Sequence, residues 1–185
     1  MQKLPSMMEA MYTKNNIIEI IKNDGVGVMP TDTLYGLVGS AFSKKAINRI
    51  YGLKKRNKKK KLIVLISSIQ DLKKFRISKH FLLSQKMFTY LNKFWPGKAS
   101  VIIEGTAFRL PAKKSLIGIL KKTGPLVAPS ANPEGLKPAE NITEAKKYFG
   151  NQVDFYLAGG TLKSEASTLI EINKKGEIKV LRGKL

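Results

Sequence analysis

The chain has 185 residues, of which 43% are hydrophobic and 25% are charged, as expected for one globular domain. It contains no cysteine, which excludes disulfides, thiolate zinc sites and cysteine nucleophiles. The 34 Lys and Arg residues against 13 Asp and Glu give a net charge of +21, which attracts polyanions such as nucleic acid or ATP. An equal alternative is a lysine-rich surface that only solvates the protein.

The first half of the chain alternates helical and strand patterns. In chain order it predicts a helix over residues 12–24, a buried strand over 26–30, a loop over 31–36, a helix over 44–55, a strand over 62–66 and a helix over 79–94. The strand at 62–66, LIVLI, is apolar on both faces, which favours the middle of a covered sheet.

The second half of the chain predicts more strands than helices. In chain order these are strands over 99–104 and 107–111 joined by a turn at Gly105-Thr106, a helix over 115–122, a strand over 125–129, a helix capped by Asn141 and ended by Gly150, and strands over 155–160, 167–172 and 178–182. The whole pattern indicates a mixed α/β domain with one central sheet. No apolar run is long enough to span a bilayer, so we expect a soluble, cytoplasmic protein without a membrane partner.

Several kinds of catalysis are excluded by what the chain lacks. His80 is the only histidine, and with no cysteine this rules out Ser-His-Asp, Cys-His and histidine-rich metal sites. No Walker or GxGxxG motif occurs. An enzyme with this sequence would work by positioning its substrates and by positive charge.

Two loops offer polar groups for a small ligand. PTDTLYG, residues 30–36, carries two hydroxyls and a phenol, although a capped turn is the simpler interpretation of this motif taken alone. In APSANPEG, residues 128–135, two prolines restrict the backbone around Ser130, Ala131 and Asn132. A rigid loop with a hydroxyl and an amide suits the binding of a small polar ligand.

The order of these motifs resembles that of the YrdC/TsaC-like L-threonylcarbamoyladenylate synthases. The shared motifs are PTDTLYG, Lys54-x-Arg56, LIVLI, FWPG (94–97), Arg-Leu-Pro (109–111), PLVAPSAN with Gly135, Gly159-Gly160, Ser167-Thr168 and VLR (180–182). They cover nearly the whole chain. The resemblance implies one domain over residues 1–185, with a twisted mixed sheet flanked by helices and a concave, positively charged cavity.

The resemblance also implies a reaction. The family condenses L-threonine, bicarbonate and ATP to threonylcarbamoyl-AMP and pyrophosphate, and a separate complex transfers the threonylcarbamoyl group to adenosine 37 of tRNAs that read ANN codons. The threonine carbamate and ATP are both anions, so cationic side chains must bring them together. Mg²⁺ would enter mainly on the ATP phosphates, which fits the shortage of carboxylates, and no protein-built metal site is expected.

The resemblance carries site roles over to ten residues in three overlapping groups. The groups are catalytic Lys54, Arg56, Ser130 and Asn132; ATP-binding Arg56, Lys60, Ser130 and Arg182; and threonine-binding Thr33, Tyr35, Arg109 and Ser167. Arg109 suits the amino-acid carboxylate because a guanidinium binds carboxylates through two parallel hydrogen bonds. As Arg109 and Arg182 lie on apolar strands, each is expected to have a partner.

Other interpretations stay open. From composition alone, Lys54 and Arg56 are helix-end cations favoured by the helix dipole. A non-catalytic module that binds structured RNA through the basic cavity, including direct contact with tRNA, is the main alternative function. A carbamoyl-phosphate-using relative in hydrogenase maturation is weaker, because such proteins carry Cys-rich zinc modules and this chain has no cysteine.

Overall fold

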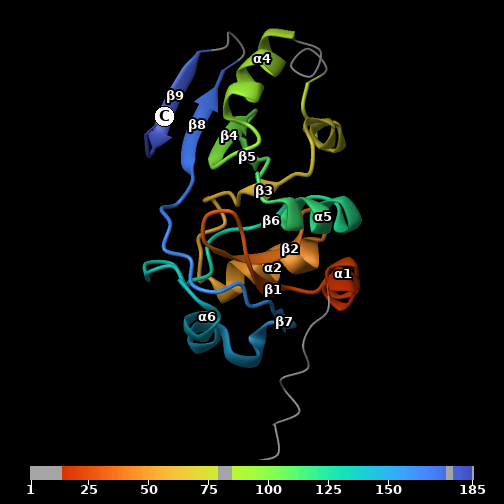
Figure 1. The fold of residues 1–185 in the computed structure, drawn as a ribbon, viewed down its shortest axis with the longest axis vertical. Coiled ribbons are helices and arrows are strands. Elements are labelled where there is room, and N and C mark those ends of the chain that lie inside the picture. Colours follow the sequence, from red (N-terminus) through yellow and green to blue (C-terminus); the bar gives the residue numbers. More distant parts are fainter. Residues whose placement is uncertain (1–13, 79–84, 174–176, 185) are drawn as a thin grey trace, which may run out of the picture.

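The computed structural model describes residues 14–78, 85–173 and 177–184, and its strands form one mixed nine-stranded sheet. The strands are β1 (Gly27–Pro30), β2 (Tyr35–Ser40), β3 (Val64–Leu65), β4 (Ala99–Ile103), β5 (Thr106–Arg109), β6 (Leu126–Val127), β7 (Phe155–Tyr156), β8 (Thr168–Ile172) and β9 (Ile178–Arg182). Their order is β7-β1-β2-β6-β3-β5-β4-β8-β9, and Figure 1 shows β9 and β7 at opposite ends of the fold. Three pairs are parallel, namely β1–β7, β3–β5 and β4–β8, so the predicted mixed sheet is confirmed.

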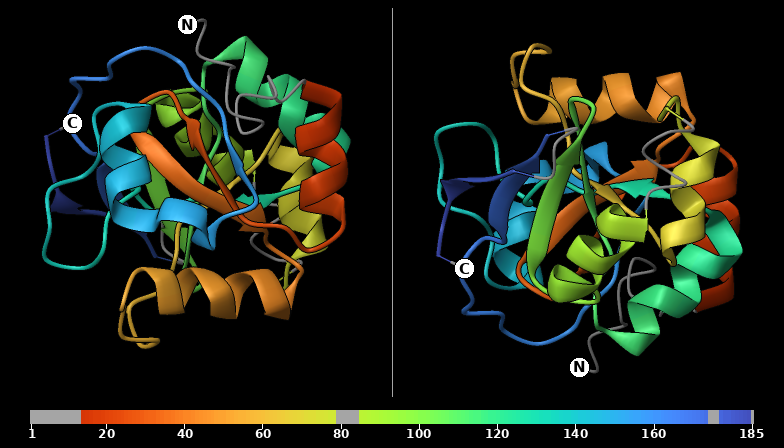
Figure 2. Two further views of the ribbon diagram at one scale, coloured as in Figure 1. Left: turned by 90° about the horizontal axis from the view of Figure 1, so that it is seen from below. Right: turned by 90° about the horizontal axis from the view of Figure 1, so that it is seen from above.

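Helices cover both faces of this sheet. They are α1 (Lys14–Lys22), α2 (Lys44–Leu53), α4 (Gln85–Phe94), α5 (Lys114–Thr123) and α6 (Ile142–Phe149), with 3₁₀ helices η1 (Ile69–Lys74) and η2 (Gly150–Gln152). Side chains alternate across a strand, so Val28 joins the apolar cluster under α2, α4 and α6, whereas Met29 joins the one under α1 and α5. Figures 1 and 2 show α1 and α5 side by side.

The ends of α6 agree with the sequence. The Asn141 side chain accepts a hydrogen bond from the Glu144 amide at 2.9 Å, and Gly150 is the C-cap residue. The Glu144 carboxylate in turn accepts from the Glu140 amide at 2.9 Å. These contacts satisfy amide groups that a helix start leaves without partners, which explains why the prediction for this helix was confirmed.

Several predicted bounds were wrong. Of the strand predicted over 155–160, only Phe155–Tyr156 form β7. The loop predicted over 31–36 ends early, because Tyr35 and Gly36 begin β2, a strand buried on both faces whose two glycines break any alternating pattern. The turn of the β4–β5 hairpin lies at Glu104-Gly105, one residue earlier than predicted. Both residues have positive φ (45° and 78°), a conformation that disfavours a β-branched residue such as Thr106, which instead starts β5.

The remaining helices are close to their predicted bounds. Of the helix predicted over 12–24, residues 12 and 13 lie outside the described residues, and α1 ends at Lys22. Of the one predicted over 79–94, residues 79–84, with His80, also lie outside them, and α4 starts at Gln85. No helix in the described part of the chain is both long and apolar enough to cross a membrane.

Candidate active site

One pocket lies where six segments distant in sequence meet, and it holds about 390 Å³ of empty space that is partly open to solvent. Its walls come from the β1–β2 loop with the start of β2, the residue before β3, the end of β5, the loop after β6, the segment before β8, and β9. The lining residues are Thr31, Thr33, Leu34, Tyr35, Gly36, Ile63, Arg109, Ala128, Ser130, Ala166, Ser167 and Arg182.

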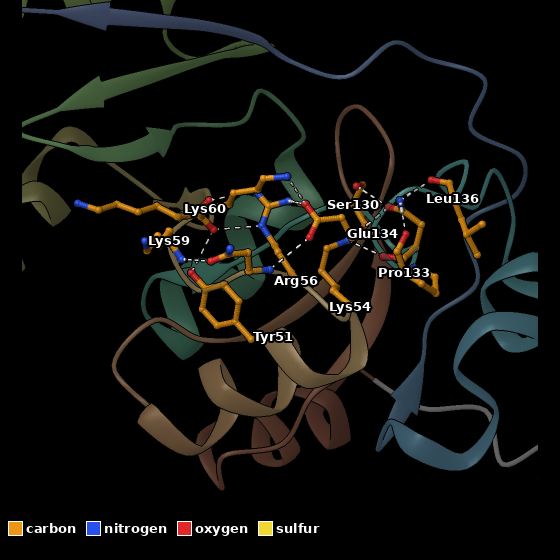
Figure 3. A network of polar contacts seen from close by, with 12 residues as sticks. Tyr51, Lys54, Arg56, Lys59, Lys60, Ser130, Pro133, Glu134 and Leu136 are labelled. Carbon is orange, nitrogen blue, oxygen red and sulfur yellow. Dashed lines mark hydrogen bonds and ion pairs between the residues drawn. The ribbon is translucent and has the colours of Figure 1, made fainter.

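The pocket brings together six of the ten predicted site residues. These six are Thr33, Tyr35, Arg109, Ser130, Ser167 and Arg182. The other four, Lys54, Arg56, Lys60 and Asn132, are not among the lining residues but form a polar network that reaches Ser130 (Figure 3). The structure therefore places the predicted threonine residues around the pocket and most of the predicted phosphate cations beside it.

Arg109 is buried in the pocket wall, and its partner is Asp32. The Arg109 Nη2 and Asp32 Oδ1 atoms are 2.9 Å apart, and the two side chains are only 4% and 7% exposed. Arg109 also donates to Thr33 Oγ1 at 3.2 Å and to Thr31 Oγ1 at 3.4 Å. Its Nε has no hydrogen-bond partner among the described residues.

Burial lowers the pKa of Arg109, whereas the carboxylate of Asp32 raises it. Asp32 thus offsets the cost of burying the guanidinium. Sequence reasoning did not name Asp32, although it lies in the PTDTLYG motif. The sequence signal for such a residue was Arg109 itself, because an arginine on an apolar strand requires an acidic partner somewhere in the fold.

The Tyr35 ring is fully buried and its hydroxyl is used within the protein. It donates to the Gly160 carbonyl at 2.7 Å and accepts from the Gly159 amide at 2.8 Å. This segment passes so close to Pro30 that a Cβ on Gly159 would lie 2.5 Å from Pro30 Cγ. Tyr35 therefore belongs to the pocket wall, and its hydroxyl holds the two glycines over the PTDTLYG loop.

Replacing Tyr35 with phenylalanine is expected to lower the free energy of unfolding by about 1–3 kcal/mol, because the Gly159 amide and the Gly160 carbonyl both lose their partner. The matched control is Tyr156→Phe, which removes a hydroxyl that donates to Gly150 at an exposed site. That change should cost under about 1 kcal/mol. Urea denaturation measures both values. Equal losses would contradict the role given to the Tyr35 hydroxyl in holding Gly159 and Gly160.

The loop of residues 128–135, APSANPEG, which we call the SAN segment, is fixed against β2 by backbone hydrogen bonds. Leu37 N donates to Pro129 O at 2.9 Å, and Ala131 N donates to Tyr35 O at 2.8 Å. Ser130 Oγ donates to Asn132 Oδ1 at 2.6 Å. The side-chain nitrogen of Asn132, Nδ2, donates to the carbonyls of Pro133 and Leu136. The Asn132 side chain thus shapes the loop, while Ser130 faces the pocket.

Lys54 lies under this loop with only 2% of its surface exposed. Its ammonium donates to Ser130 O at 2.5 Å and to Asn132 O at 2.6 Å, and Asn132 Oδ1 is 3.4 Å away. Burial, and to a smaller extent the charge of Arg56, lowers the pKa of Lys54 to about 8, whereas Glu134 opposes the shift. In this structure Lys54 positions the SAN backbone, and its predicted contact with the substrates stays a prediction.

The lowered pKa of Lys54 predicts a pH dependence of stability. Below pH 8 the lysine is protonated in both the folded and the unfolded chain. Between about 8 and its ordinary pKa of 10.5, the unfolded chain binds the proton more tightly, so the folded state gains stability as the pH rises. The free energy of unfolding should therefore rise by about 3 kcal/mol over this range relative to Lys54→Met. Urea denaturation at pH 8 and pH 10.5 measures this, and parallel curves for the two proteins would contradict it.

Ser167 and Arg182 close the pocket from the β8–β9 side. Ser167 Oγ lies 2.9 Å from Ser100 Oγ, and both serines are buried. Arg182 donates to Ser167 O from Nη2 at 2.9 Å and from Nε at 3.2 Å. Burial lowers the pKa of Arg182, and the charge of Arg56 lowers it further.

Arg56 and Lys60 belong to the segment after α2, residues 54–61, which we call the basic loop. Arg56 Nε donates to Lys60 O at 3.1 Å, and the two side chains share the carboxylate of Glu134 (Figure 3). No group of three or more His, Asp or Glu side chains in the described residues lies together as a metal site would require. The expectation that Mg²⁺ enters with ATP stays a prediction, as does the net positive charge of the cavity.

Comparison with known proteins assigns the chain to a family. The sequence profile of the Sua5/YciO/YrdC family, described as telomere recombination, matches residues 19–183. The chain belongs to this family. It is also similar to the threonylcarbamoyl-AMP synthase of Cellvibrio japonicus, with 27% identity over 160 residues, 78% of this chain and 82% of that protein.

Solved structures of this family share the fold. Sua5 of P. abyssi complexed with L-threonine has a TM-score of 0.81 at 23% identity, over 91% of this chain and 53% of that chain. E. coli YciO has a TM-score of 0.78 at 21% identity, over 91% of this chain and 87% of that chain. This chain therefore spans about half the length of the Sua5 protein and most of YciO, and the predicted YrdC-like fold is confirmed.

Proposed function

We propose that this member of the Sua5/YciO/YrdC family is an L-threonylcarbamoyladenylate synthase. It would condense L-threonine, bicarbonate and ATP to threonylcarbamoyl-AMP, pyrophosphate and water. The observation that carries the proposal is the meeting of Arg109 and Thr33 with Ser130 and Arg182 in one pocket. A similar curated protein has this synthase name, and a solved structure of the same fold is complexed with L-threonine.

Arg109 and Thr33 would bind the amino acid. The Arg109 guanidinium lines the pocket, and Asp32, which is not among the lining residues, holds it at Nη2. A carboxylate would bind guanidinium hydrogens that Asp32 and the two threonine hydroxyls leave unused. The Thr33 hydroxyl, 3.2 Å from Nη1, would add a hydrogen bond at the same end of the substrate.

Arg56 and Lys60 would bind the phosphates, with Arg182 and Ser130 beside the nucleotide. An oxygen of the threonine carbamate attacks the α-phosphorus, the bond to the bridging oxygen breaks, and pyrophosphate leaves with the electron pair. The cations of the basic loop would stabilise the negative charge on the transferring and leaving groups. Mg²⁺ would enter bound to ATP and neutralise further phosphate charge. Lys54 would hold the SAN backbone in place from below.

The product would pass to a threonylcarbamoyl-transfer complex that modifies tRNA, and a cytoplasmic location is part of the same proposal. Direct contact with tRNA through the lysine-rich surface also remains a proposal. The alternative of a non-catalytic RNA-binding module is not favoured, because the similar curated protein has an enzyme name.

The proposal is tested by measuring pyrophosphate release with purified protein, ATP, Mg²⁺, L-threonine and bicarbonate, and with each component omitted in turn. Release should need every component. Release without threonine, or none with the complete mixture, would overturn the proposed reaction. L-Valine serves as a control amino acid, because it replaces the threonine hydroxyl with a methyl group of similar size.

A further inference from the structure

The carboxylate of Glu134 lies among the cations of the basic loop (Figure 3). Its Oε1 is 2.7 Å from Lys60 Nζ and 4.0 Å from Arg56 Nη1, and its Oε2 accepts a hydrogen bond from the Asn57 amide at 3.2 Å. The Glu134 amide donates to Lys54 O at 2.6 Å. One residue of the SAN segment is thus bound to four positions of the basic loop.

A ligand can reach this cluster. The Glu134 side chain is 28% exposed, Arg56 is 26% exposed and Lys60 is 61% exposed. The hydrogen bond and charge of Lys60 lower the pKa of Glu134, with a smaller effect from Arg56, so this carboxylate stays ionised at neutral pH. A carboxylate and a phosphate use the same donors of arginine and lysine. Glu134 therefore competes for the same two cations with any phosphate that binds there.

Other carboxylates in the protein have a different environment. Asp154 accepts from Arg49 and from the Val26 amide, and joins α2 to the segment before β7. Asp71 accepts from Ser67, which precedes η1, and from Lys74 at the end of η1. None of their cations is a predicted ligand of the substrates. Glu134, by contrast, binds two cations that the proposed reaction requires, and it does so from the segment that places Ser130 in the pocket.

We propose that Glu134 is an internal anion that occupies the phosphate-binding position of Arg56 and Lys60 until a polyphosphate binds and displaces it. The proposal rests on the proposed function insofar as it takes these two cations as phosphate ligands. Glu134 keeps the basic loop ordered between turnovers and weakens nucleotide affinity, because its interactions must break before phosphate binds. It thereby sets the affinity of the site for nucleotide.

Glu134→Gln removes the negative charge of this side chain and keeps its length. Glutamine has the same length but one side-chain oxygen in place of two, so it can accept from either Lys60 or the Asn57 amide. The backbone hydrogen bond from the amide of residue 134 to Lys54 O still anchors the loop. The negative charge that competes with phosphate is gone. Exposed ion pairs are weak, so the dissociation constant for polyphosphate should fall about three- to tenfold.

The matched control is Glu140→Gln. Glu140 also lies between β6 and α6 and also pairs with an exposed lysine, with its Oε1 2.6 Å from Lys137 Nζ. Lys137 is not a predicted phosphate ligand, so this variant should bind polyphosphate like the wild type.

Isothermal titration calorimetry of the full chain with inorganic pyrophosphate and with ATP tests the proposal, at low and at physiological ionic strength (about 0.15 M). Tighter binding of both ligands by Glu134→Gln alone, with a smaller difference at the higher salt, is the expected result. Unchanged or weaker binding by Glu134→Gln, an equal gain in Glu140→Gln, or no pyrophosphate binding by any of the three proteins would overturn it. The titration needs no turnover. A wild type that makes no threonylcarbamoyl-AMP would therefore refute the proposed function and leave this test valid.

Discussion

Arg56→Ala is expected to lower the rate of threonine-dependent pyrophosphate release by about 10²- to 10³-fold, the loss typical of removing one charged donor from a transition state. Arg56 lies in the basic loop near both Lys54 and Arg182, whose pKa values it lowers. It also donates to the Lys60 carbonyl, so its removal takes away a cation and an anchor of the loop. The steady-state rate at saturating substrates is the measurement.

Two control variants separate these effects. Arg56→Lys keeps the positive charge but loses the planar guanidinium, which can donate two parallel hydrogen bonds. This variant should therefore give an intermediate rate. Lys59→Ala removes an exposed lysine of the same loop and should leave the rate near that of the wild type. If the protein were only an RNA-binding module, Arg56→Ala would weaken RNA binding. It would reduce the slope of log binding constant against log salt concentration by about one. Equal rates for Arg56→Ala and Lys59→Ala would rule out the role assigned to Arg56.

Asp32→Asn is expected to lower the free energy of unfolding by about 3–5 kcal/mol, because it leaves the buried guanidinium of Arg109 without a counter-charge. For a domain of this size, that loss corresponds to a decrease in Tm of roughly 6–20 °C. Thermal denaturation followed by circular dichroism measures it.

The matched control is Asp24→Asn, at a left-handed position (φ 64°) that asparagine also tolerates, where the change should stay within about 0.5 kcal/mol. The double variant Asp32→Asn/Arg109→Met should recover much of the lost stability, because a buried ion pair replaced by apolar groups is often neutral. A double variant as unstable as Asp32→Asn alone would show that the unpaired charge is not the cause.

Much of the fold could be predicted from local signals. The predicted helix from Asn141 to Gly150 was confirmed because its caps are contacts between residues close in sequence. Their residue types, an asparagine at the start and a glycine at the end, mark them in the sequence. Strand β2 was missed because it is buried on both faces and contains two glycines, so neither alternation nor composition marks it.

The candidate site was predictable as a set of residues but not as a set of contacts. Six of the ten carried-over residues do line one pocket. Asp32 could not be identified as the partner of Arg109, because the pairing depends on how β5 lies beside the β1–β2 loop. The contacts of Lys54 with two SAN carbonyls likewise come from tertiary folding, and no local pattern encodes them.

The most direct test of the proposed reaction is mass spectrometry of the nucleotide products formed from isotope-labelled bicarbonate, L-threonine and ATP. The account predicts threonylcarbamoyl-AMP with the label in its carbamoyl carbon, formed in step with pyrophosphate. Unlabelled AMP or ADP as the sole nucleotide product, with no adenylate that contains threonine, would contradict it.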